Sequence, residues 1–233
     1  MSNILAIETS TTVCSVALLS NNIIIATKES IEKNAHSRLL TVLINKLLEE
    51  QNFQINNIDA FAVSIGPGSY TGLRIGVSVT KGLCYGLSKP AIAVSTLKAM
   101  AKQFLNNNSD ITNNTNILLC PMIDARRLEV YTALYQTSLI EILSPRPLIV
   151  DELSFVVHLK NQKMFFFGDG AEKYKNIIIS QNAEFDSSIK PSAIAVAQIA
   201  QEMYNKKQFA DVTYFEPSYL KDFIAIKSTK KLF

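Results

Sequence analysis

The chain has 233 residues, of which 48% are hydrophobic and 18% are charged, and its formal net charge at pH 7 is +3. This length predicts one or two globular domains that fold without a disulfide or metal staple. The net charge is too small to indicate nucleic-acid binding by itself, and no stretch approaches about 18 uninterrupted apolar residues, which argues against a helical membrane protein.

The pattern of the first half predicts alternating strands and helices. Short apolar runs separated by polar turns favour strands, and apolar residues recurring at helical spacing favour helices. In chain order, we expect strands at residues 4–7, 13–19 and 23–25, a helix at 35–51, a strand at 60–65, a helix at 70–87, a strand at 91–95 and a helix at 96–105.

The second half repeats this order after an asparagine-rich stretch, residues 106–116, which is the best linker candidate. The pattern predicts two similar α/β lobes, residues 1–105 and a smaller one at 106–233, each with a central mixed sheet and flanking helices. In the second lobe we expect strands at 117–123, 129–135 and 139–143, a helix at 151–160, a strand at 164–167 and a helix that begins at Pro191.

Four glycines interrupt the helix predicted at residues 70–87, namely Gly72, Gly76, Gly82 and Gly86. Each glycine inside a helix costs roughly 0.5–1 kcal/mol relative to alanine, so four of them need a reason. We favour a face cleared for close contact with another helix. Packing within the chain's own core is the second interpretation, and a phosphate cradle is the third, because Lys81 lies in the wrong register for a phosphate-binding loop.

Candidate catalytic groups are few. The two histidines, His36 and His158, form no metal-binding pair, so we predict neither a metal site nor a catalytic site. Ser69 lacks the flanking pattern of a nucleophile elbow, although its pairing with His36 stays open. Glu8 ends a predicted buried strand before a turn rich in hydroxyls, where it either ligates Mg²⁺ through water or is a solvated turn residue.

Basic residues raise two further alternatives. Arg126 or Arg127 could bind phosphate or an acidic partner, although adjacent arginines in a turn are more often a solvated corner. Lysines gather at the end of the chain, where a solvated tail is commoner than one that faces RNA; they are Lys221, Lys227, Lys230 and Lys231. The segment GDGA that starts at Gly168 repeats the order of strand, glycine turn and helix, but it is weak evidence for a nucleotide site.

The three cysteines indicate a reducing compartment. Cys14, Cys84 and Cys120 form no C-x-x-C pair and lie among apolar neighbours, so we expect buried free thiols. The start of the chain lacks a basic segment, and Glu8 interrupts its only apolar run, which is unlike a signal peptide. We therefore expect a cytoplasmic protein.

Five segments together resemble the bacterial TsaB (YeaZ) family: ILAIETSTTVCSVALL, HSRLL, SIGPGSYTGLRIGVSVTKGLCYG, AVSTLKAMA and DARRLEVYTALY. The resemblance implies a two-lobed fold of the actin/Hsp70/sugar-kinase type. It also implies a non-catalytic scaffold subunit in the synthesis of N6-threonylcarbamoyladenosine on tRNAs that read codons beginning with A. The implied partners are a TsaD-type transferase in a heterodimer and a TsaE-type ATPase, with self-pairing into a homodimer when the chain is alone.

The resemblance carries over to particular residues of this chain. It implies no tightly bound cofactor, with ATP and Mg²⁺ engaged only in the complex. The alternatives are a stand-alone ATPase or phosphotransferase of the same fold and, with little support, a peptidase. The implied partner interface is Leu39, Leu43, Leu47, Gly72, Gly76 and Val79; the implied family loop is Gly66, Pro67, Gly68, Tyr70, Thr71 and Arg74; and the vestigial nucleotide site is Glu8, Thr9 and Ser10.

Overall fold

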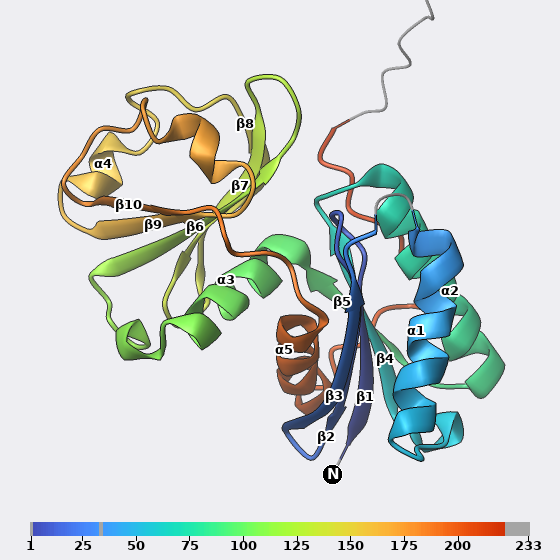
Figure 1. The fold of residues 1–233 in the computed structure, drawn as a ribbon. Coiled ribbons are helices and arrows are strands. Elements are labelled where there is room, and N and C mark those ends of the chain that lie inside the picture. Colours follow the sequence, from blue (N-terminus) through green and yellow to red (C-terminus); the bar gives the residue numbers. More distant parts are fainter. Residues whose placement is uncertain (1, 33–34, 222–233) are drawn as a thin grey trace, which may run out of the picture.

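The computed structural model describes residues 2–32 and 35–221 of the chain, and it forms two lobes (Figure 1). Lys227, Lys230 and Lys231 of the predicted basic tail lie outside the described residues. In the first lobe, β1 is apolar from Ile4 to Ile7 and is the central strand, with antiparallel β2 and β3 on one side and parallel β4 and β5 on the other. The strands are β1 (Asn3–Glu8), β2 (Cys14–Ser20), β3 (Ile23–Ser30), β4 (Ala60–Gly66) and β5 (Ala91–Ser95).

The second lobe repeats this topology. Its first strand, β6, is again central, with an antiparallel pair on one side and a parallel pair on the other, in the order β10-β9-β6-β7-β8. The predicted pair of α/β lobes with mixed sheets is therefore confirmed. The strands are β6 (Ile117–Asp124), β7 (Val130–Gln136), β8 (Glu141–Leu148), β9 (Lys163–Phe167) and β10 (Ala183–Asp186).

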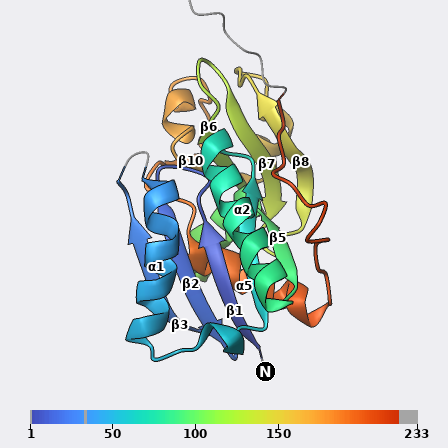
Figure 2. The ribbon, with the colours of Figure 1, turned by 90° about the vertical axis from the view of Figure 1, so that its right-hand side faces the viewer.

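Helices α1 (His36–Glu50) and α2 (Tyr70–Leu87) lie side by side on one face of the first sheet (Figure 2). Alternation along β1 explains this arrangement, since Leu5 and Ile7 pack in the cluster beneath α1 and α2. Ile4 and Ala6 point to the opposite face.

Helices α3 (Thr96–Asn107) and α5 (Ala193–Asn205) fill the space between the two sheets. The alanine-rich face of α5 packs on the first sheet against small residues such as Ala6 and Ala62. Helix α3, in contrast, packs Leu97 and Phe104 against the second sheet. Helix α5, although it lies in the second half of the chain, therefore packs on the first sheet, and α3 contacts both sheets.

The second lobe also corrects individual elements. The helix predicted at residues 151–160 shrinks to α4 (Val156–Leu159), because the Asp151 carboxylate accepts hydrogen bonds from Leu153 and Ser154 and holds them in a turn. The sequence pattern predicts neither β10 nor three short 3₁₀ helices, η1 (Ile55–Asn57), η2 (Ser109–Ile111) and η3 (Ala171–Tyr174). Strand β8 extends beyond the prediction at an edge of its sheet, where its prolines cost no ladder hydrogen bond.

Within the described ranges, no helix is both long and apolar enough to cross a bilayer.

Candidate functional site

The turn between β1 and β2 gathers the acid and hydroxyls of the predicted nucleotide site. Glu8, Thr9 and Ser10 are all buried, with at most 1% of their surface exposed, so the interpretation of Glu8 as a solvated turn residue is wrong. The Oε1 atom of Glu8 accepts a hydrogen bond of 2.5 Å from the backbone N–H of Ser10. Its Oε2 atom has no hydrogen-bond partner among the described residues. Burial raises the pKa of Glu8, and hydrogen bonding to Ser10 only partly offsets that rise.

The glycine-rich loop covers this turn from outside. The backbone N–H of Ser69 donates a 2.6 Å hydrogen bond to the carbonyl oxygen of Ser10. A Cβ atom on Gly68 would lie 2.3 Å from that same oxygen, and one on Gly72 would lie 2.1 Å from the carbonyl oxygen of Thr9. The glycine loop is thus packed backbone against backbone on this turn.

This packing corrects the interpretation of two interface residues. Gly72 and Gly76 are buried, and a Cβ atom on Gly76 would lie 2.3 Å from the hydroxyl oxygen of Thr9. Both glycines therefore admit the chain's own turn instead of a partner helix, which was the second interpretation of their spacing. Leu47 is also unavailable to a partner, since it is fully buried in the core beneath α1.

The other two glycines of α2 have the opposite surroundings. Gly82 and Gly86 are exposed, and a Cβ atom on either would meet no atom of residues 2–32 or 35–221 within 4 Å. The fold of the single chain therefore does not explain why these two positions carry glycine. Among the predicted interface residues, Leu39, Leu43 and Val79 are only half-buried and keep some surface on the α1 and α2 side.

A hollow of about 460 Å³ lies on this outer side of α1 and α2. It brings together Tyr70, Thr71, Arg74 and Val79 of the sequence-predicted set. Its remaining lining residues are Ser37, Ile75 and Ser78. The hollow is lined by apolar and hydroxyl groups with one cation, a mixture suited to a protein partner.

Arg74 is held in place by Tyr70 and by Tyr219, a residue far away in the sequence that no local pattern connects to it. Its guanidinium lies 4.2 Å from the ring centroid of Tyr70, and its Nε donates a 3.0 Å hydrogen bond to the hydroxyl of Tyr219. Tyr219 belongs to residues 210–221, here called the C-terminal strap. The strap is fixed to the first lobe where the N–H of Ser218 donates to the carbonyl of Ile65, 2.7 Å away, and it reaches the second lobe through an ion pair of Lys221 with Glu129.

The side chains of Ser69 and His36 each contact the backbone of the chain. The Ser69 hydroxyl accepts a hydrogen bond from the N–H of Gly72 and caps α2, while the Nε2 atom of His36 lies 3.3 Å from the carbonyl oxygen of Val13. No contact in the described chain joins the two side chains, and His158 lies in the short helix α4 of the other lobe.

The predicted buried free thiols are confirmed. All three cysteines are free and buried. Burial raises the pKa values of the Cys14 and Cys84 thiols to about 11 and that of Cys120 to about 12, so the reactive thiolate is suppressed at neutral pH.

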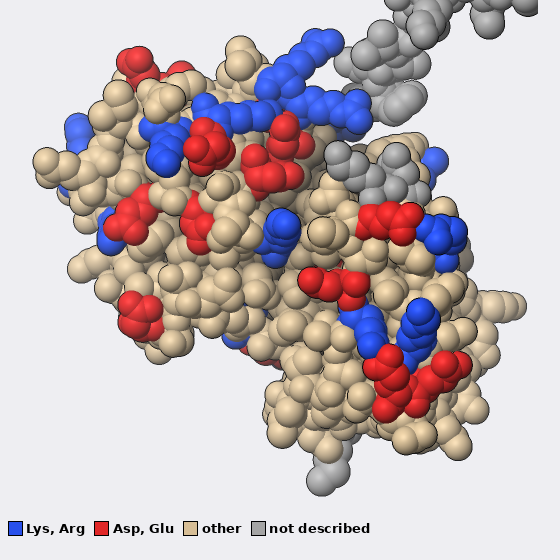
Figure 3. All heavy atoms as spheres, in the orientation of Figure 1, with Lys and Arg blue, Asp and Glu red and all other residues tan. Residues whose placement is uncertain are grey.

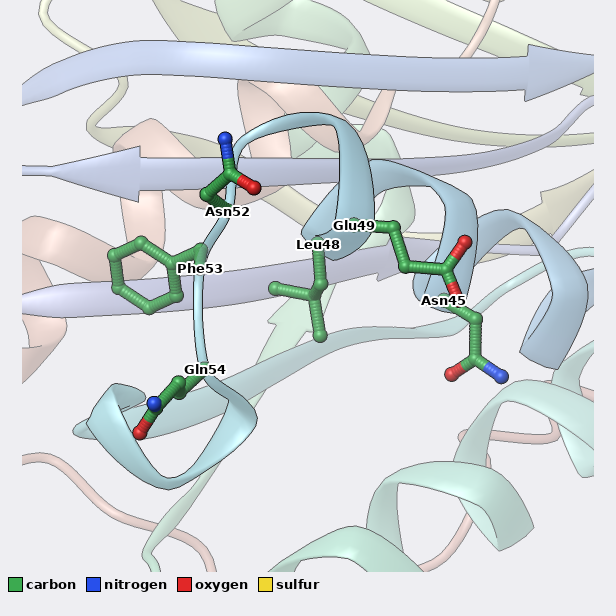
Figure 4. A pocket seen from close by; sticks show the side chains of 6 residues that line it. All are labelled: Asn45, Leu48, Glu49, Asn52, Phe53 and Gln54. Atoms are coloured by element: carbon green, nitrogen blue, oxygen red, sulfur yellow. The ribbon is translucent and has the colours of Figure 1, made fainter.

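A second hollow, of about 330 Å³, lies at the end of α1 (Figure 4). Glu49 is its one ionisable group, and amide side chains and two apolar ones surround it: Asn45, Asn52, Gln54, Leu48 and Phe53. It contains none of the predicted site residues. In the described part of the chain, no group of three or more His, Cys, Asp and Glu residues could hold a metal ion.

Comparison with known proteins gives consistent matches along nearly the whole chain. A family model described as "TsaD: tRNA N6-adenosine threonylcarbamoyltransferase" matches residues 22–228. The tRNA threonylcarbamoyladenosine biosynthesis protein TsaB of Bacillus subtilis is 31% identical over 94% of this chain and 93% of its own length. The protein of the same name from Escherichia coli is 30% identical over 96% of each chain.

Solved structures agree with these sequence matches. YeaZ from Pseudomonas aeruginosa superposes with a TM-score of 0.83 at 28% identity and covers 94% of this chain and 100% of that one. The polyphosphate/ATP-glucomannokinase of Arthrobacter superposes with a TM-score of 0.51 at 7% identity, over 88% of this chain and 100% of its own. The second match concerns the fold alone and identifies it as the sugar-kinase type that the resemblance implied.

Proposed function

The chain belongs to the TsaB (YeaZ) family, and from this premise we propose that it serves the synthesis of N6-threonylcarbamoyladenosine in tRNA as a non-catalytic subunit paired with a TsaD-type transferase. The tRNA substrates are those that read codons beginning with A. The proposal includes a cytoplasmic location, recruitment of a TsaE-type ATPase by the pair, and self-pairing of the chain when no partner is present.

The observation that carries the proposal is the unexplained pair of glycines on the outside of α2. Exposed glycines inside a helix cost up to about 1 kcal/mol each relative to alanine, and no described part of the chain lies within 4 Å of a Cβ atom placed on Gly82 or Gly86. A partner helix packed closely against this side of α2 would explain both glycines, because glycine lets two helix backbones approach closely. The adjoining hollow, with the half-buried Leu43 and Val79 beside it, supplies apolar area for the same contact.

The closed turn after β1 supports the non-catalytic part. Catalysis by Glu8 requires a substrate or metal within reach of its carboxylate, yet that group is fully buried beneath the glycine loop. For the same reason we propose that the isolated chain binds no nucleotide tightly, and that ATP and Mg²⁺ act only in the assembled complex. Titration of the isolated chain with ATP tests this, and stoichiometric micromolar binding would favour the stand-alone ATPase instead.

Pairing is tested by mixing the chain with the TsaD-type protein of its organism and measuring the mass of the complex by light-scattering chromatography. We expect a stable one-to-one complex that replaces self-association. Gly82→Leu should leave the fold intact, because its side chain enters open space, and should weaken pairing at least tenfold by blocking close helix approach.

The matched control is Glu202→Leu, which adds leucine at an exposed position of α5 on the other side of the sheet. Full pairing by Gly82→Leu would contradict the proposed face. The wider function is tested in cells: if deletion of the gene leaves threonylcarbamoyladenosine in tRNA unchanged, the role in this modification is wrong.

A further inference from the structure

The turn between β6 and β7 carries two adjacent arginines in a backbone conformation that arginine does not favour. Arg126 and Arg127 have φ angles of 70° and 54°, both in the left-handed region. The turn between β2 and β3 also has two successive left-handed residues, and there they are Asn21 and Asn22, at φ 52° and 68°. Asparagine tolerates this region well, whereas other residues with a side chain are destabilised there by on the order of 1 kcal/mol each. The arginines are thus not explained by the conformation of their turn.

The backbone of this turn is fixed from several sides, so its side chains start from defined positions. The carboxylate of Asp124 accepts a 2.6 Å hydrogen bond from the N–H of Arg126. The ammonium group of Lys173 donates to the carbonyl oxygen of Arg127 at 3.0 Å, and the Tyr174 hydroxyl donates to that of Leu128 at 2.5 Å. Such a turn presents its arginines without having to be ordered first.

The acids near the turn are already engaged. Asp124 forms an ion pair with Lys173, and Glu129 forms one with Lys221. Arg126 and Arg127 are exposed, and neither forms an ion pair with any residue that the structure describes. Figure 3 shows basic side chains along the top of the second lobe, with acidic side chains directly beneath them. The tip of the turn therefore carries two exposed guanidinium groups outside the ion pairs of the described chain, and the charge of Arg126 helps to lower the pKa of the neighbouring Asp124.

We propose that the β6–β7 turn is a contact site for RNA phosphates, with Arg126 and Arg127 as the binding groups. Guanidinium groups match the geometry of phosphate oxygens with paired hydrogen bonds. The choice of RNA over an acidic protein rests on the proposed function, in which tRNA is the substrate of the complex. The site lies on the second lobe, away from the α1 and α2 surface, so RNA and a protein partner can bind together.

The test is fluorescence anisotropy of a labelled tRNA transcript with the full chain, over a series of salt concentrations. The double variant Arg126→Gln with Arg127→Gln should lose on the order of tenfold in affinity at low salt, and the slope of log K against log salt should fall by about two. Lys206→Gln with Lys207→Gln has the same net charge, lies at the exposed end of α5, and should bind like the unmodified chain.

Three outcomes would overturn the proposal: no binding of tRNA by the unmodified chain, equal losses in both double variants, or a loss seen with poly-glutamate and not with tRNA. The last would identify a site for an acidic protein. The variant with lysine at both positions should retain most of the slope and lose part of the affinity. Since this assay does not depend on modification of tRNA, its failure is separable from failure of the proposed function.

Discussion

The two lobes share one topology, yet they use the turn after their first strand in opposite ways. Each first strand ends on an acid, Glu8 in β1 and Asp124 in β6. Glu8 has no exposed surface and one carboxylate oxygen without a partner among the described residues, whereas Asp124 is exposed and paired with Lys173. The same position in a repeated fold has thus become a packing element in one lobe and a surface element in the other.

The cause of this difference is the helix that comes after the fourth strand of each lobe. In the first lobe β4 leads into the 18-residue helix α2, whose first turns lie directly on the β1–β2 turn. In the second lobe β9 leads only into the four-residue η3. This short helix contacts the β6–β7 turn only through Lys173 and Tyr174, so the side chains at the tip of the turn stay exposed. Helix α2 therefore both closes the turn of the first lobe and supplies the proposed partner surface.

The largest effect is expected from a substitution that forces α2 away from the β1–β2 turn of the first lobe. Gly72→Val would place its Cβ atom about 2 Å from the backbone oxygen of Thr9, where no flexible side chain can give way. We expect a loss of about 3 kcal/mol or more in the free energy of unfolding, measured by urea denaturation. Gly86→Ala in the same helix should instead gain about 0.5–1 kcal/mol, because its Cβ atom meets nothing. Equal stability of the two variants would contradict the account of the sealed turn.

The glycines of α2 also show which structural features could be predicted from the sequence and which could not. Their cost in a helix is visible from the sequence, and so is the choice between a partner and the chain's own core. The answer differs between the pairs, Gly72 with Gly76 and Gly82 with Gly86, because it depends on which side of α2 faces the sheet. That orientation is set by tertiary packing, which periodicity does not resolve when glycine and serine interrupt the apolar pattern.

The fold could be predicted further than the site. Among the described elements, apolar runs predicted nine of the ten strands and four of the five α-helices, because buried strands and amphipathic helices carry periodic signals. Strands β3 and β8 nevertheless extend five residues beyond their predicted ends. The packing of α5 on the first sheet leaves no such signal, since an alanine-rich helix fits either sheet. Likewise, the contact of Tyr219 with Arg74 joins residues 145 positions apart, which local patterns cannot reveal.

A smaller effect is expected from the buried acid itself. Burial raises the pKa of Glu8 from its ordinary value near 4.5, so the folded chain holds this proton more tightly than the unfolded chain. The stability contributed by the protonated form is complete at pH values below 4.5 and is lost as the pH rises through the folded pKa. Glu8→Gln should remove this dependence and be more stable than the unmodified chain at pH 8, by about 1 kcal/mol or more.

Urea denaturation of both proteins between pH 4 and pH 8 measures this difference, and the two should approach each other at the acid end. If stability instead rises with pH through this window only in the unmodified chain, Glu8 is ionised and paired in the folded protein. The closed arrangement of the first turn would then be wrong.

The smallest effect is expected at the matching acid of the second lobe, and it has the opposite sign with pH. Burial acts to raise the pKa of Asp124, but the hydrogen bonds from Lys173 and from the N–H of Arg126 outweigh it, and the net pKa is lowered below 3.8. The stability it contributes is present at neutral pH and lost as the pH falls through the folded pKa. Because both partners of its ion pair are about a third exposed, Asp124→Asn should cost less than about 1 kcal/mol at pH 7.

Thermal unfolding at low and high salt checks this, since screening should shrink the difference at Asp124 and leave the effect of Glu8→Gln nearly unchanged. A salt-independent loss of several kcal/mol at Asp124 would mean that the second turn is as tightly built into its lobe as the first.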